Sequence, residues 1–275
     1  MDTKDETVSL ELSDHARRIR TTILRMIYES GDGHVGCALS VVEILLALYF
    51  RVMNIGPELL QDEARDRFIL SKGHAVAVLY ATLIERGIAP MEIADQYCRN
   101  GSVVGSHASR NAAPGIEVGT GSGGHGLPIG VGMALAARRA GKGARVFVLC
   151  GDGELAEGSM WEAIGVAGHH ALGDLKLIVD ANGFQSEGRT EDIIDLRPME
   201  AKFRAFRWDS DLVDGHDVER MSTLLSANRD KPYALIAQTT KGKGVSFMEG
   251  KYDWHHISPT KEQYEQALQE LGGAQ

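Results

Sequence analysis

The sequence has few cysteines, no long apolar run and no excess of basic residues. Its three cysteines, at positions 37, 98 and 150, are too few for a disulfide framework, so we expect free thiols in a reducing compartment, the cytoplasm. No apolar run reaches about 18 residues, and residues 1–7 are polar and acidic, so we expect neither a membrane span nor an export signal. With 29 basic and 38 acidic residues, a net charge of −9 and no dense basic cluster, nucleic acid and anionic membranes are poor candidates for partners.

Glycine, in contrast, is abundant. It accounts for 32 of 275 residues, well above the usual roughly 7%, and the excess lies in a few loops where backbone can approach a ligand closely. The length suits one large α/β domain with a sizeable core, and there are no repeats or low-complexity linkers. We therefore expect a single domain over residues 1–275, with an N-terminal extension at 1–12 and a C-terminal tail helix within 260–275.

Helical and strand patterns alternate along the chain. Apolar periodicity and capping signals predict helices at 13–30, 41–53, 75–86, 128–139, 158–170, 218–227 and 260–271. Short apolar runs predict strands at 67–70, 146–149, 177–179 and 233–238, with a further segment at 206–213. The longest irregular stretches, 189–202 and 244–259, we place over the site or at a subunit contact. This alternation predicts an α/β fold with a doubly wound, mostly parallel sheet and helices on both faces.

Two polar residues follow neighbouring predicted strands. Asp152 lies in the Gly-Asp-Gly of residues 151–153, after the apolar run that ends at Cys150, and Asn182 follows the next strand. Because such crossovers are right-handed and adjacent, both side chains emerge at the edge of the sheet where open α/β folds bind ligands. Their oxygens suit Mg²⁺, and Gly153 lets backbone N–H groups approach a phosphate. A plain turn is the alternative reading, and the strand-end context favours a metal-diphosphate site.

Residues 151–188 resemble the thiamine-diphosphate signature of transketolases, which opens with Gly-Asp-Gly and closes with an Asn about thirty positions later. Five other segments resemble, in order and spacing, parts of the transketolase amino-terminal domain: 31–36 (GDGHVG), 71–75 (SKGHA), 105–107 (GSH), 119–126 (GTGSGGHG) and 239–256. The resemblance covers about residues 13–259 and implies a thiamine-diphosphate-binding fold of the diphosphate-binding (PP) type. It also implies transfer of a two-carbon ketol group from a ketose, or ketose phosphate, to an aldose.

The resemblance assigns binding roles to residues of this sequence. Mg²⁺, for which Ca²⁺ or Mn²⁺ can substitute, would be bound by Asp152, Asn182 and the backbone carbonyl of Phe184. Residues expected to bind thiamine diphosphate are His74, Gly121, Gly123, Gly153, Asn182 and Lys241. The sequence departs from the usual family pattern at Gly123, His125, Lys241 and residues 256–258. These departures bear on the identity of the substrate more than on the cofactor.

Histidines gather in the predicted loops. In transketolases, positions matching His34, His74, His107 and His255 line the channel over the thiazolium ring and contact sugar hydroxyls. The resemblance implies proton transfer by His34 and His255 and orientation of hydroxyl groups by His107, roles that suit imidazole because it both donates and accepts. Glu157 matches an acidic position that joins a proton network between two active sites. A helix-start carboxylate is the alternative for Glu157.

The resemblance also implies a second chain. The family's activating glutamate, the aromatic pocket for the aminopyrimidine ring and the groups that bind sugar phosphate belong to a second domain, which 275 residues cannot hold as well. We therefore expect one subunit of a split transketolase, inactive alone. Its partner would be a separate C-terminal subunit carrying the pyrimidine-binding domain, in a two-plus-two assembly with sugar phosphates as substrates.

Several alternatives stay open. Another thiamine-diphosphate enzyme, such as a deoxyxylulose-phosphate synthase or the α subunit of a 2-oxoacid dehydrogenase, shares much of the pattern. A dinucleotide-binding module is possible because residues 121–126 fit G-x-G-x-x-G, a weak signal when alone. A catalytically silent regulatory half is a third reading. Zinc is not expected, because no histidine pair shows close ligand spacing with cysteine or lies in a His-Glu-x-x-His helix.

Overall fold

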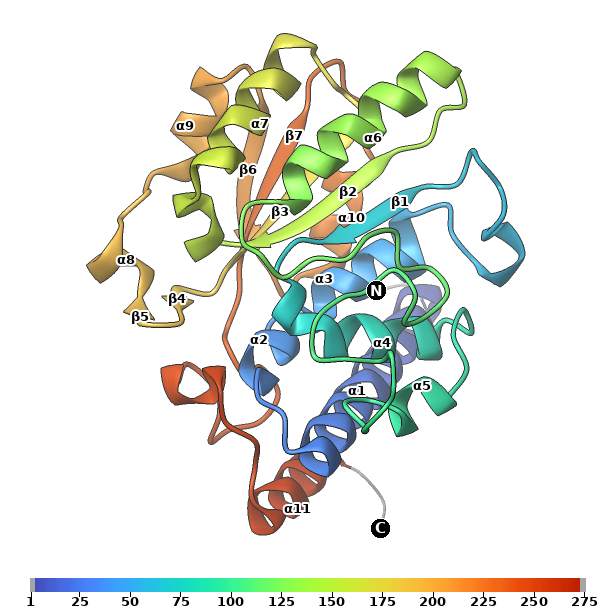
Figure 1. Ribbon diagram of the computed structural model, residues 1–275, viewed down its shortest axis with the longest axis vertical. Helices are drawn as coiled ribbons and strands as arrows, with labels where there is room; N and C mark the ends of the chain where they lie inside the picture. Colours follow the sequence, from blue (N-terminus) through green and yellow to red (C-terminus); the bar gives the residue numbers. More distant parts are fainter. Residues whose placement is uncertain (1–2, 273–275) are drawn as a thin grey trace.

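A five-stranded parallel sheet forms the centre of the computed structural model, which describes residues 3–272 (Figure 1). Its strand order is β1-β2-β3-β7-β6. The strands are β1 (Arg67–Leu70), β2 (Val146–Gly151), β3 (Leu175–Ala181), β6 (Asp209–Asp214) and β7 (Tyr233–Gln238). β2, β3 and β7 are buried along almost their whole length, as expected of strands covered on both faces. The predicted doubly wound, mostly parallel sheet is confirmed.

Helices cover both faces of the sheet. On one side lie α6 (Gly126–Ala140), α7 (Gly158–His169) and α9 (Met199–Ala205), and on the other α1 (Thr3–Ser30), α3 (Val42–Ala47), α4 (Val76–Glu85) and α10 (Val218–Ser226). The two faces bury separate apolar clusters, and alternate residues of one strand point into each: Val146 and Val148 into the first, Phe147 and Leu149 into the second.

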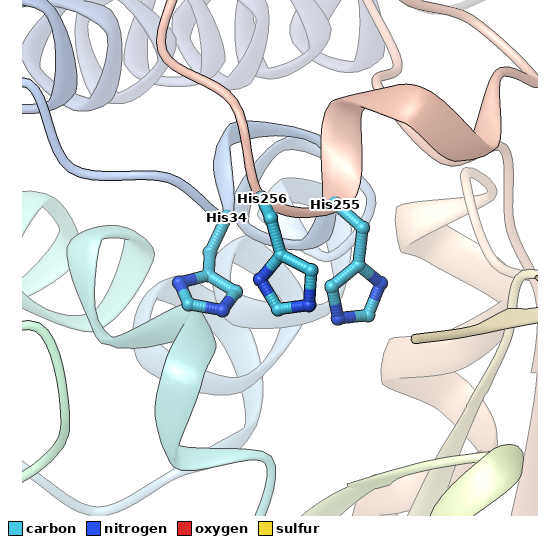
Figure 2. A group of neighbouring side chains, drawn as sticks. All are labelled: His34, His255 and His256. Atoms are coloured by element: carbon cyan, nitrogen blue, oxygen red, sulfur yellow. The ribbon is translucent and has the colours of Figure 1, made fainter. Parts of the chain in front are cut away.

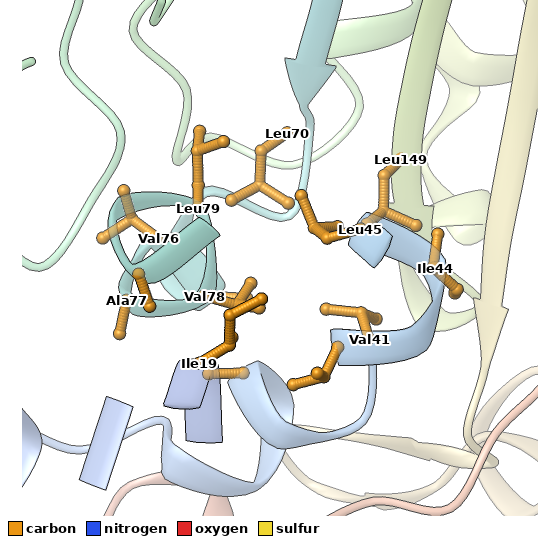
Figure 3. Packing of buried hydrophobic residues seen from close by; sticks show 14 of the residues in the cluster. Ile19, Val41, Ile44, Leu45, Leu70, Val76, Ala77, Val78, Leu79 and Leu149 are labelled. Carbon is orange, nitrogen blue, oxygen red and sulfur yellow. The ribbon is translucent and has the colours of Figure 1, made fainter. Parts of the chain in front are cut away.

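The second cluster is the larger part of the core. Figure 3 shows a section of it, where Ile19 of α1, residues beside and within α3, and residues 76–79 of α4 meet Leu70 and Leu149 at the ends of two strands. All of these side chains are at most 2% exposed. The carboxyl ends of β1 and β2 are therefore fixed by close packing beneath them.

Shorter elements complete the chain. The helical ones are α2 (Val35–Leu39), α5 (Glu92–Asp95), α8 (Thr190–Ile193), α11 (Lys261–Glu270), a π-helical turn at Leu48–Val52, and 3₁₀ turns at Pro57–Leu59, Gly73–Ala75, Gly153–Ala156 and Tyr252–His255. A small antiparallel pair joins β4 (Phe184–Gln185) to β5 (Gly188–Arg189). Among residues 3–272, no helix combines the length and the apolar character that crossing a bilayer requires.

The structure differs from the predicted elements in three places. The first helix begins at Thr3 rather than at 13, and residues 1–2 of the predicted extension and 273–275 of the predicted tail lie outside the described residues. The helix predicted at 41–53 is α3 followed by a π-helical turn at its end. Val41 leaves helical geometry at φ −112° and separates α3 from α2. The stretch predicted as irregular at 189–202 contains α8 and the start of α9.

Parallel pairing brings the ends of β2 and β3 together. Gly151 pairs with Asp180 in the ladder, so Asp152 and Asn182 leave neighbouring strands at the same edge of the sheet. β1 and β7 end at this edge too and continue into Ser71 and Thr239. The predicted adjacency of Asp152 and Asn182 is confirmed.

We predict opposite outcomes for two helical glycines changed to alanine. A Cβ at Gly168 of α7 would lie 1.9 Å from the Phe206 carbonyl oxygen, whereas a Cβ at Gly132 of α6 would meet nothing within 4 Å. Gly168→Ala should lower the free energy of unfolding by about 3 kcal/mol, because backbone must move. Gly132→Ala should leave it unchanged or raise it by up to about 1 kcal/mol, through helix propensity. Urea unfolding measures both, and equal effects would contradict the packing described for α7.

Candidate functional site

A cavity of about 520 Å³ opens at the carboxyl edge of the sheet. Of the residues for which the sequence predicts a role, all except Lys241 line this cavity. These lining residues are His34, His74, His107, Gly121, Gly123, Asp152, Gly153, Glu157, Asn182, Phe184 and His255. The chain thus brings together loops from all parts of the sequence, although the roles of these residues remain predictions.

Asp152 lies at the floor of the cavity. Its two carboxylate oxygens accept hydrogen bonds from the backbone N–H groups of Gly153 and Gly183, each at 2.9 Å. Burial, and then the nearby charge of Asp180, raise the pKa of Asp152 to about 6. A buried carboxylate without a full counter-charge is the environment that a divalent cation relieves, so the floor fits Mg²⁺.

Asn182 is oriented by the strand beside it. Its amide Nδ2 donates to Asp180 Oδ2 at 2.7 Å, and its Oδ1 accepts from the backbone N–H of Phe184 at 3.0 Å. Asp180 is fully buried and also accepts from Lys72, Ser40 and Thr239. Burial alone would raise the pKa of Asp180, but the ion pair with Lys72 and these hydrogen bonds hold it below its usual value. The amide of Asn182 is therefore fixed, with oxygen and nitrogen distinguished by their partners.

Two glycines let backbone approach the centre of the cavity. A Cβ at Gly153 would lie 2.7 Å from Gln185 Cβ, and one at Gly121, whose φ is +157°, would lie 2.9 Å from His107. Any side chain at these positions would fill the space between the loops. Such a backbone-lined space fits the diphosphate group predicted from the sequence.

Two glutamates stand on the same side of the cavity with different roles. Glu154 accepts hydrogen bonds from Ser71 Oγ and from the backbone N–H groups of Gly124 and Gly151, and so ties three loops together. Glu157 precedes α7, is exposed, and makes no side-chain hydrogen bond or capping contact within the described chain. The sequence predicted no role for Glu154, because its contacts with Ser71 and Gly124 join positions that are distant in the sequence.

Four predicted histidines form the opposite wall. The ring centroid of His34 lies 5.2 Å from that of His74, 5.9 Å from that of His107 and 5.8 Å from that of His255. Burial, and then the neighbouring His74, lower the pKa of His34 to about 4, and burial also lowers the pKa of His107. The neutral imidazoles of His34 and His107 each offer one donor and one acceptor, which suits a ligand rich in hydroxyl groups.

A second feature of this wall is the close contact between two loops. The backbone N–H of His34 donates to the carbonyl of His255 at 3.0 Å. His34 has a left-handed φ of 67°, a conformation that costs a non-glycine residue on the order of 1 kcal/mol or more. Figure 2 shows the result: His34 from one loop and His255 and His256 from the other extend side by side. No role was predicted for His256 from the sequence, and only the fold shows that it lies beside His34 (Figure 2).

Lys241 lies behind the wall rather than in the cavity. Its Nζ is 3.1 Å from Cys37 Sγ and 3.1 Å from His255 Nδ1, and the lysine is 1% exposed. Burial alone would raise the pKa of Cys37, but contacts with His255, His74 and Lys241 hold it well below its usual value. Cys37 is thus a buried thiol group with a lowered pKa beside His255, a role that the sequence did not indicate because His255 and Lys241 are more than 200 positions away.

Related proteins match this chain along nearly its whole length. A family model described as "Transketolase, thiamine diphosphate binding domain" matches residues 12–274. One subunit of the apulose-4-phosphate transketolase of Phocaeicola vulgatus is 41% identical, over 96% of this chain and 94% of that protein. The 6-deoxy-6-sulfo-D-fructose transketolase subunit SqwG of a Clostridium species is 40% identical, over 95% of this chain and 96% of that protein.

Solved transketolases have the same architecture over a longer chain. The structure of the Leishmania mexicana enzyme superposes with a TM-score of 0.86 at 29% identity, covering 95% of this chain and 41% of that one. Human transketolase is 34% identical, over 94% of this chain and 42% of that protein. The chain therefore spans about two fifths of the longer transketolases that it matches.

We predict that Asp152→Asn changes how stability depends on pH. In the folded chain the pKa of Asp152 is about 6, above its usual 3.8. Ionisation of Asp152 therefore lowers the free energy of unfolding as the pH rises from about 4 to 6, and the whole loss remains at higher pH. From pH 4.5 to 7.5, the metal-free variant should gain on the order of 2 kcal/mol relative to the wild type. Urea unfolding at both values measures this.

The same pair of proteins tests the metal site. Mg²⁺ with thiamine diphosphate should raise the melting temperature of the wild type at pH 7.5 and leave that of Asp152→Asn almost unchanged. A difference in stability that does not vary with pH, or an equal response to the metal, would contradict the role given to Asp152.

Proposed function

The chain belongs to the transketolase family, and we propose that it is the diphosphate-binding subunit of a two-chain enzyme that transfers a ketol group from a ketose to an aldose. The observation that carries this proposal is the pairing of two surfaces in one cavity. Asp152 and Asn182 supply hard oxygens on the floor, and four histidines line the same cavity, of which His34 and His107 have lowered pKa values. The named relatives and structures are transketolases, which favours ketol transfer over the dinucleotide-binding and 2-oxoacid alternatives.

The floor would hold the cofactor. Asp152, Asn182 and the carbonyl of Phe184 would bind Mg²⁺, or Ca²⁺ or Mn²⁺ in its place, and the backbone around Gly153 would approach the diphosphate. When bound, thiamine diphosphate supplies the nucleophilic carbon that attacks the ketose carbonyl. The fit is supported by the raised pKa of Asp152 and by the amide of Asn182, which Asp180 holds in one orientation.

The histidine wall acts on the sugar. His34 and His255 hold and move protons at the donor's third-carbon hydroxyl and at the acceptor's aldehyde oxygen, and His107 orients hydroxyl groups farther along the chain of carbons. The lowered pKa values of His34 and His107 favour this, because a neutral imidazole accepts a proton from a hydroxyl and returns it. Lys241 contributes indirectly, through its contacts with Cys37 and His255, rather than by binding the diphosphate.

A second chain completes the site. The two relatives described as transketolase subunits match this chain over nearly their whole length, whereas longer transketolases continue well beyond it. The partner supplies the pyrimidine-binding domain and the groups that bind sugar phosphates, in a two-plus-two assembly. Glu157, exposed at the cavity without a partner in the described chain, lies where it can join such an interface. The unpaired thiols of all three cysteines fit the expected cytoplasmic location.

We predict that the purified chain binds thiamine diphosphate in the presence of Mg²⁺ but does not turn over a ketose phosphate. Turnover should appear on addition of the pyrimidine-domain subunit, because the activating glutamate comes from that chain. Calorimetry and a coupled aldose-release assay measure the two properties. Full activity of the chain alone would contradict the need for a partner, and absence of cofactor binding even with the partner would contradict the proposed function.

In the assembled enzyme, His255→Asn should lower kcat by roughly 100-fold or more, the contribution typical of acid–base catalysis. His169→Asn is the matched control, because His169 is an exposed histidine in the last turn of α7, outside the cavity. Cofactor affinity, measured by calorimetry, should be unchanged in both variants. Equal kcat values for the two variants would remove His255 from the chemistry.

A further inference from the structure

Three histidines at the wall of the cavity come close enough to share one ion. One ring nitrogen from each of His34, His255 and His256 lies within 4.8 Å of the other two, and Figure 2 shows the three rings side by side. A tetrahedral zinc ion bound at about 2.0–2.1 Å needs its ligand nitrogens about 3.3 Å apart. Side-chain rotations can bring the nitrogens from within 4.8 Å to this separation, since His256 is exposed.

The backbone holds these side chains together before any ion arrives. His34 N–H donates to the His255 carbonyl at 3.0 Å, and a Cβ at Gly33 would lie 2.7 Å from the backbone of His256. Glycine at position 33 is what allows the two loops to touch. His255 and His256 are also adjacent in sequence, so a single contact between their loop and the loop of His34 sets the positions of all three ligands.

The ring nitrogens are available as ligands. His34 Nδ1 is buried and has no hydrogen-bond partner within the described chain, and the His256 side chain is exposed. Burial comes first among the causes that lower the pKa values of both residues, so both imidazoles are neutral at pH 7 and protons do not compete for their lone pairs. His255 Nδ1 lies 3.1 Å from Lys241 Nζ and 3.7 Å from Cys37 Sγ, so Nε2 is the nitrogen of this ring that remains available to an ion.

We propose that His34, His255 and His256 form a binding site for a transition-metal cation of the zinc type, and that the bound ion closes the sugar channel. The site is separate from the oxygen-lined Mg²⁺ site in residues and in chemistry, since imidazole nitrogens prefer zinc, cobalt, nickel or copper to magnesium. A second group, Cys37, His74 and His255, has similar spacing. Lys241 Nζ already lies 3.1 Å from both Cys37 Sγ and His255 Nδ1, so an ammonium group takes the cation's place there.

The consequence for activity rests on the proposed function. The same cavity contains His74 and His107, so an ion bound by His34 and His255 removes the imidazoles that would contact the sugar. Zinc is then a reversible inhibitor that competes with the ketose and not with thiamine diphosphate.

Cobalt provides the direct test, because tetrahedral Co²⁺ with nitrogen ligands absorbs strongly in the visible range whereas octahedral Co²⁺ with oxygen ligands does not. The full chain, with excess Mg²⁺ to fill the oxygen site, is titrated with Co²⁺ and then with Zn²⁺ as a competitor. The wild type and His169→Gln should give the tetrahedral spectrum, and Zn²⁺ should abolish it. His256→Gln should bind at least about 100-fold more weakly, since even the loss of an outer contact to a metal ligand costs 10- to 100-fold.

The outcomes separate the site from the function. Circular dichroism checks that His256→Gln is folded, as expected for an exposed side chain. Equal Co²⁺ affinity in the wild type and His256→Gln, or no tetrahedral spectrum in the wild type, overturns the metal site. If the spectrum appears as predicted but Zn²⁺ inhibits the assembled enzyme and its His256→Gln form equally, the closing of the channel is overturned and the metal site stands.

Discussion

A buried ion pair between Lys72 and Asp180 fixes the floor of the cavity. Lys72 follows β1, Asp180 lies in β3, and both side chains are at most 2% exposed. Asp180 also accepts hydrogen bonds from Ser40 between α2 and α3, from Thr239 after β7, and from Asn182. Removing either charge would leave the other buried without compensation, a change that costs several kcal/mol in typical proteins. The position of Asn182, a predicted metal ligand, therefore depends on this buried network.

The cavity combines this rigid floor with a wall held by different means. Within residues 3–272, Asp152 forms no ion pair with a full counter-charge, and its pKa, like those of His34 and His107, is displaced toward the neutral form. Displaced pKa values of this kind are typical of sites that bind ions or move protons. The lysines near the site are committed elsewhere, Lys72 to Asp180 and Lys241 to Cys37. The described residues that line this cavity thus offer no free lysine for a sugar phosphate, in keeping with a partner that supplies a cation.

The parts of the site that follow local rules could be predicted from the sequence. Parallel pairing alone places Asp152 beside Asn182, and glycine-rich loops mark where backbone approaches a ligand. Contacts between distant positions could not be predicted, because no local pattern encodes them. Cys37 and Lys241 are 204 positions apart and Lys72 and Asp180 are 108 apart. Likewise, the apolar pattern that predicted one helix over 41–53 did not reveal that residues 48–52 form a π-helical turn.

In the proposed function, the strand-end oxygens of this chain hold the metal of a thiamine-diphosphate site. Anomalous diffraction from crystals of the chain grown with Mn²⁺ and thiamine diphosphate, with the pyrimidine-domain subunit present, measures this directly. We predict one strong peak per chain between the carboxylate of Asp152, the amide oxygen of Asn182 and the carbonyl of Phe184, with diphosphate density beside Gly153. A metal bound away from these three oxygens, with the cofactor in place, would contradict the account.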